Sequence, residues 1–157
     1  MRATSLLTAP AIVLVALALT FSTPGTAHGQ VDTAVSIAGT LAGQSGVAKL
    51  GVNVRGTAAH LSGSGGSAHV ALASPATFTF DGALDGSVVT LHGRVAHAAF
   101  ESLVATPVTL IADVSTGATE LSFGPIPAGP LAGQTLTFTG TGDVSVTDPR
   151  AHAVSHP

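Results

Sequence analysis

Residues 78–95, FTFDGALDGSVVTLHGRV, contain the pattern from which the fold can be predicted. Apolar and polar residues alternate on both sides of Asp85-Gly86, a dipeptide that suits the two-residue type I′ turn of a β-hairpin. A turn at that position pairs Phe80 with Leu91. The alternation then places the large apolar residues on one face of the hairpin and the polar residues on the other. The predicted apolar face contains Leu84, Phe80, Phe78, Leu91 and Val95, and the predicted polar face contains Thr77, Thr79, Asp81, Thr90, His92 and Arg94.

The same kind of pattern recurs along most of the chain. Short alternating runs rich in Val, Thr, Ile and Phe are separated by Gly, Ser, Pro and Asp. No long segment after the leader has the i, i+3, i+4, i+7 spacing of an amphipathic helix. The expected strands are 33–41, 47–57, 67–73, 76–83, 87–98, 106–115, 118–124 and 134–146. About eight short strands predict an all-β, single-domain antiparallel fold, either a β-sandwich or a small β-barrel.

A second hairpin is expected in residues 108–124, and two registers can be considered for it. A two-residue turn places Asp113 directly opposite Glu120, where the like charges would need a cation or a shared proton. A three-residue loop that ends in a left-handed Gly117 places Asp113 opposite Thr119 instead. The second register avoids the repulsion and is the one we predict.

The first 27 residues resemble a secretory signal peptide. Residues 6–21 are mostly apolar, Arg2 is the only charge, and Gly25 and Ala27 occupy the small positions before a cleavage site. The apolar core is shorter than the roughly 20 residues of a membrane-spanning helix. We therefore expect a helical signal peptide over 1–27, cleavage after Ala27 and a secreted protein with no membrane segment. Because Arg2 is the only charge before the apolar core, an uncleaved membrane anchor is the alternative.

Cleavage after residue 27 would leave 130 of the 157 residues, which is enough for one domain with its own core. The expected organisation is a β-rich domain over 28–147 and a mobile tail over 148–157, where apolar periodicity ends. The chain contains no cysteine, so packing or a bound ion must stabilise it.

Composition excludes several classes of function. The chain has five Lys or Arg against eight Asp or Glu, and its basic residues are scattered, so nucleic-acid binding is not expected. There is no G-x-S-x-G or H-E-x-x-H motif and no cysteine nucleophile, so no enzyme activity is predicted. Trp and Tyr, the usual platforms for sugar stacking, are also absent, which counts against a carbohydrate-binding module but does not exclude one that relies on hydrogen bonds.

Histidines supply the candidate metal site. If cleavage follows Ala27, His28 becomes the N-terminal residue, and its amine and imidazole can chelate Cu(II). The segment Ala27-His28-Gly29 resembles the start of secreted copper-dependent polysaccharide monooxygenases and of small periplasmic copper carriers. That resemblance implies a copper ligand at His28. The monooxygenases normally carry the aromatic residues that this chain lacks, so their activity is not expected. The interpretation we favour is that a histidine simply follows the cleavage site, because small and polar residues often occupy that position.

Two further histidines, His60 and His69, lie near the two ends of the segment AHLSGSGGSAH, residues 59–69. A turn at Ser64-Gly65 would bring His60 opposite His69, close enough to share one metal ion with His28. The alternative is a flexible Gly/Ser loop between two solvated histidines, which we favour because glycine-rich strands hold their register poorly.

One short repeat is also present: GTLAGQ at 39–44 is followed by GPLAGQ at 129–134. Because alanine and glycine are so common in this chain, we interpret the repeat as coincidence. The alternative is a pair of matching turns at the two ends of a closed sheet.

The function predicted from the sequence is a secreted, non-catalytic β-domain. It would have a binding or extracellular assembly role, with an extracellular partner or a second copy of the chain. Unguarded edge strands could pair with that partner. A small apolar ligand inside a barrel is a further alternative, as is a copper-binding protein that uses His28, His60 and His69. No other cofactor is expected.

Overall fold

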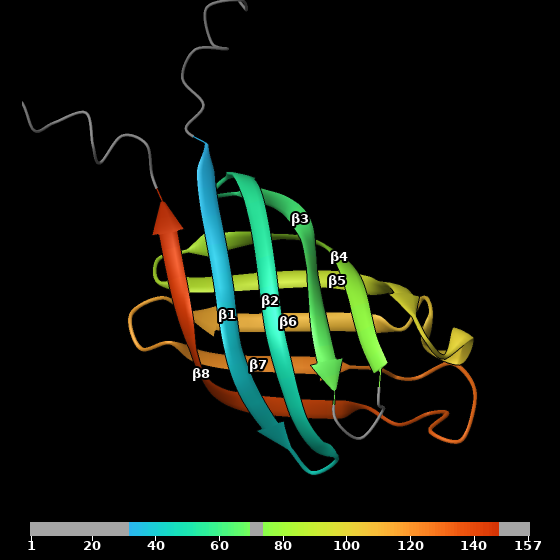
Figure 1. The fold of residues 1–157 in the computed structure, drawn as a ribbon. Helices are drawn as coiled ribbons and strands as arrows, with labels where there is room; N and C mark the ends of the chain where they lie inside the picture. The colour runs from blue at the N-terminus through green and yellow to red at the C-terminus, as the bar shows by residue number, and fades with distance from the viewer. Residues whose placement is uncertain (1–31, 70–73, 148–157) are drawn as a thin grey trace, which may run out of the picture. The chain divides into compact units, whose positions relative to one another are not determined.

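The computed structural model describes residues 32–69 and 74–147. They form eight strands and one short 3-10 helix (Figure 1). The strands are β1 (Thr33–Gly43), β2 (Gly46–Thr57), β3 (His60–His69), β4 (Ser74–Asp85), β5 (Val88–Ala98), β6 (Pro107–Asp113), β7 (Ala118–Phe123) and β8 (Leu136–Thr147). The helix η3 (Glu101–Leu103) lies between β5 and β6. The expected leader over 1–27, with His28, and the tail over 148–157 lie outside the described residues.

Each strand pairs antiparallel with the next, and β8 pairs with β1, so the sheet closes into a barrel. The all-β prediction is confirmed, and of its two alternatives the β-barrel is correct. Figure 1 shows β1 to β3 crossing β5 to β7 at a steep angle, with β8 bending from the second group to meet β1. Among the described residues, no helix is long and apolar enough to cross a membrane.

Glycines facing the interior allow β8 to bend beside β1. Gly39 pairs with Gly142, and a Cβ atom added to Gly39 would lie 2.9 Å from the Gly142 Cα. Two facing residues without side chains therefore let the strands approach closely at the corner of the barrel.

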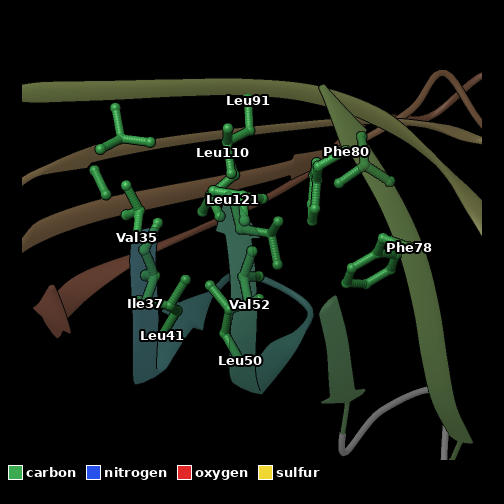
Figure 2. Packing of buried hydrophobic residues seen from close by; sticks show 14 of the residues in the cluster. Val35, Ile37, Leu41, Leu50, Val52, Phe78, Phe80, Leu91, Leu110 and Leu121 are labelled. Atoms are coloured by element: carbon green, nitrogen blue, oxygen red, sulfur yellow. The ribbon is translucent and has the colours of Figure 1, made fainter. Parts of the chain in front are cut away.

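Apolar side chains fill the barrel. Figure 2 shows the side chains of the core between the two groups of strands. Phe78, Phe80 and Phe138 are each about 1% exposed or less, and the rings of Phe78 and Phe80 make an edge-to-face contact with centroids 5.7 Å apart. The ring of Phe123 makes edge-to-face contacts with two of these rings, and its centroid lies 5.3 Å from that of Phe78 and 6.0 Å from that of Phe138. This packed interior argues against a small apolar ligand inside the barrel.

The β4–β5 hairpin forms as predicted, with the predicted faces, but in a different register. Asp85 pairs with Val88, so the two-residue turn is Gly86-Ser87 rather than Asp85-Gly86, and Phe80 faces Gly93 instead of Leu91. Gly86 has a φ of 61° at the first position of the turn, as a type II′ turn requires. The shift is an even number of residues, so the inward and outward faces are unchanged.

The β6–β7 hairpin has neither of the two registers considered. Ile111 pairs with Glu120 and Ala112 with Thr119, so a four-residue loop follows Asp113. Gly117 does have the predicted left-handed backbone, with a φ of 76°. The observed loop is one residue longer than the predicted three-residue loop. The longer loop places the buried Leu110 opposite the buried Leu121, and core packing therefore decides the register.

The Asp113 carboxylate organises this loop. One of its oxygens accepts hydrogen bonds from the Ser115 hydroxyl and from the backbone N–H groups of Ser115 (2.7 Å) and Thr116 (3.2 Å). The Ser115 hydroxyl, followed by the backbone N–H of Ser115, holds the pKa of the Asp113 carboxyl below its usual value of 3.8.

We expect this carboxylate to stabilise the fold above its ordinary pKa of 3.8 and to lose that effect as the pH falls through the lower folded-state pKa. The check is the thermal midpoint of wild type and Asp113→Ala from about pH 7 to about pH 2.5. Wild type should unfold at the higher temperature at neutral pH, and the difference should shrink in acid. A difference that stays constant over the whole range would contradict this role.

The third strand lies where a turn or a loop was expected. β3 runs without interruption from His60 to His69, paired with β2 on one side and β4 on the other. Both the hairpin turn at Ser64-Gly65 and the flexible loop are therefore wrong, and the predicted strand 67–73 overlaps only the end of β3.

The closed barrel also changes the expected mode of association. Every described strand has a paired neighbour on both sides, so no free edge is available to a partner. Strand addition at an edge is therefore wrong for this domain, and a partner would have to contact the faces, turns or ends of the barrel.

Candidate functional site: a polar cleft on the outer face of β3 to β5

The outer face of β3, β4 and β5 has a cleft of about 760 Å³. We call it the histidine cleft. Its polar lining residues are His60, Thr79, Asp81, Thr90, His92 and Arg94. Around them lie only alanines and glycines, among them Ala83 and Gly93, and these small residues form the floor of the cleft.

Strand alternation places these polar side chains outside the barrel. On β4 the inward positions belong to Phe78 and Phe80, so Thr79 and Asp81 point outward and are exposed. On β5 the buried Leu91 precedes the exposed His92. The core that closes the barrel therefore also presents the polar groups, since successive side chains point to opposite faces of a strand.

The register brings groups of different charge together. Asp81 pairs with His92, and Thr79 pairs with Arg94. Side chains directly opposite each other on antiparallel strands have Cβ atoms roughly 4.5–5.5 Å apart. A carboxylate, an imidazole and a guanidinium therefore share two neighbouring rows of the outer face.

Two hydrogen bonds orient the basic groups. The Nδ1 atom of His92 lies 3.3 Å from the hydroxyl oxygen of Thr109 on the neighbouring strand β6. Arg94 donates from Nη1 to the backbone oxygen of Ala105 at 3.4 Å. A guanidinium has five N–H donors, so this one contact leaves most of the Arg94 donors available to a ligand.

The structure does not bring the predicted metal ligands His60 and His69 together. They lie at opposite ends of β3, and nine residues of extended strand span roughly 30 Å. His28 lies outside the described residues, so its role remains a prediction. Within 32–69 and 74–147, no group of three or more His, Cys, Asp or Glu residues is arranged to hold a metal ion.

Part of the histidine cleft follows from the sequence. The alternation in residues 78–95 predicts that Asp81, His92 and Arg94 share an outer face, and this is confirmed. The sequence did not predict that His60 lines this cleft, because β3, the strand that begins at His60, was not recognised as a strand. The only signal for it was non-local, since β3 has glycines where β4 has phenylalanines.

Comparison with known protein families gave no matching family model, and comparisons with curated proteins and with solved structures gave no significant match.

Proposed function

We propose that this chain is an exported, non-catalytic binding protein that recognises a small polar ligand at the histidine cleft. The observation that carries the proposal is the convergence of Asp81, His92 and Arg94 on one open cleft with a floor of small residues. Export is proposed from the leader pattern in residues 1–27.

The donors and acceptors of the cleft favour a ligand with an acidic group and several hydroxyl groups. A guanidinium binds a carboxylate, sulfate or phosphate through paired hydrogen bonds, and Arg94 is the one arginine of the cleft. His60 and His92 add imidazole donors, while Asp81 can only accept when ionised and therefore suits a ligand hydroxyl.

Binding fits this site better than catalysis. His60, Asp81, His92 and Arg94 are all exposed. Catalytic acids and bases usually act in sites that exclude water, where electrostatic interactions are stronger. The packed interior also supports an outer-face site over one inside the barrel.

The test compares two sugars that differ in one group. Glucuronate has the hydroxyl-bearing ring of glucose and an added carboxylate. We expect glucuronate at millimolar concentration to shift the backbone amide signals of Thr79, Asp81, His92 and Arg94 in a ¹H–¹⁵N spectrum. Glucose should leave these signals in place.

Equal responses to the two sugars at these residues would contradict the proposed acidic ligand. The absence of any response to glucuronate would contradict the proposed ligand class. Shifts spread over inward-facing residues such as Leu91 would contradict an outer-face site.

A further inference from the structure

A second cleft lies over the seam where β1 meets β8, and it has a volume of about 640 Å³. We call it the glutamine cleft. Gln44 and Ser45 reach it from the β1–β2 turn, and Gln134 and Thr135 from the segment that precedes β8. It shares no lining residue with the histidine cleft.

The two glutamines are the last residues of the two LAGQ copies noted in the sequence. The copies have different local structures. Residues 41–43 end β1, whereas Gly133 has a left-handed backbone and donates a hydrogen bond to the Ile126 carbonyl at 2.8 Å. The copies are therefore not matching turns, yet both glutamines line one cleft.

The lining is polar and uncharged. No Asp, Glu, Lys, Arg or His belongs to it, and its hydroxyl-bearing residues are Ser45, Thr135, Thr137 and Thr139. The Thr137 hydroxyl oxygen lies 3.3 Å from that of Ser122 on β7. Gln44 and Gln134 are both exposed. Every carboxamide and every hydroxyl in the cleft can both donate and accept a hydrogen bond.

We propose that the glutamine cleft binds a neutral polyhydroxylated ligand, a saccharide. A sugar hydroxyl also donates and accepts, and a carboxamide can donate to one ring hydroxyl while it accepts from the next. An ionic ligand would find no counter-charge in this lining. This second site does not depend on the proposed role of the histidine cleft.

The binding rests on hydrogen bonds alone, because the chain has no Trp or Tyr on which a sugar ring could stack. Hydrogen bonds that replace bonds to water contribute little individually, so we expect dissociation constants in the millimolar range.

The experiment titrates the protein with three neutral trisaccharides: maltotriose, cellotriose and tri-N-acetylchitotriose. Backbone amide signals are followed by NMR. At least one trisaccharide should shift the signals of residues 44–45 and 134–139. Triethylene glycol, whose ether chain mainly accepts hydrogen bonds, should not. An end-capped triglycine tests the alternative of a peptide ligand.

Two isosteric variants test the carboxamides. Gln44→Glu and Gln134→Glu keep the shape and an acceptor but remove the N–H donors, and each should weaken binding roughly fivefold. Asn53→Asp makes the same chemical change at an exposed site on β2 outside the cleft, and should leave binding unchanged.

Four results would overturn the proposal. The first is the absence of these shifts with all three trisaccharides. The second is an equal response to triethylene glycol or a stronger one to the capped triglycine. The third is an equal loss of binding in Asn53→Asp. Shifts at Thr79 or His92 instead would assign the sugar to the histidine cleft and would also overturn it.

Discussion

Phe80→Ala is expected to lower the free energy of unfolding by about 3–5 kcal/mol. Phe80 is 1% exposed and belongs to the core, where its ring makes an edge-to-face contact with that of Phe78. On both strands that neighbour β4, the residue paired with Phe80 is a glycine: Gly63 on β3 and Gly93 on β5. Removing the ring would leave a cavity that the surrounding side chains fill only in part.

Urea denaturation followed by far-UV circular dichroism measures this effect, since the chain has no Trp or Tyr for fluorescence. Phe100→Ala is the matched control, because Phe100 is 54% exposed and should change stability by about 0.5 kcal/mol or less. Similar losses in the two variants would mean that Phe80 does not occupy the core as described.

Gly93→Ala is expected to destabilise the barrel by about 1–3 kcal/mol. A Cβ atom at Gly93 would lie 2.9 Å from Cδ1 of Phe80 and still closer to the backbone oxygen of Thr79. The carbonyl belongs to the paired strand and cannot move aside without disturbing the β4–β5 ladder. The same denaturation experiment measures the loss.

Gly51→Ala provides the control within the same sheet. A Cβ atom at Gly51 would have no heavy atom within 4 Å, so this variant should be neutral or more stable by up to about 1 kcal/mol. If Gly93→Ala is as stable as Gly51→Ala, Phe80 does not lie against Gly93 and the β4–β5 register is wrong.

In the β4–β5 hairpin, the faces of the strands could be predicted from the sequence, but the register could not. The faces of β4 and β5 follow from alternation, and the even shift in register left them unchanged. The register itself depends on where the large rings fit. The turn at Gly86-Ser87 places Phe80 opposite Gly93, and this packing outweighs the local preference of Asp85-Gly86 for a turn.

β3 was missed for the same physical reason. Its inward positions include Gly63 and Gly65, so HLSGSGGSAH lacks the apolar alternation of a strand. Those glycines pair with Phe80 and Phe78 on β4. A Cβ atom added to Gly63 or Gly65 would lie within 3 Å of β2, so the strands are packed too closely there for a larger residue. Such complementarity joins segments distant in sequence and has no local signature.

The two candidate sites also differ in how far the sequence predicts them. Asp81, His92 and Arg94 could be placed together from one hairpin, because their positions depend only on alternation. Gln44 and Gln134 are far apart in the chain, and they line one cleft only because β8 closes against β1. The LAGQ repeat was visible in the sequence, but the shared cleft depends on the barrel.

We propose above all that an acidic ligand binds on the outside of the barrel, at the histidine cleft, and that Arg94 binds its acidic group. The affinity of glucuronate for wild type, Arg94→Gln and Arg55→Gln tests it most directly. Arg55 is an exposed arginine on β2 that does not line the cleft. We predict that Arg94→Gln weakens binding at least about tenfold, because a charged hydrogen bond is lost, and that Arg55→Gln changes it by about twofold or less. Equal affinities in all three proteins, or equal losses in the two variants, would contradict the claim.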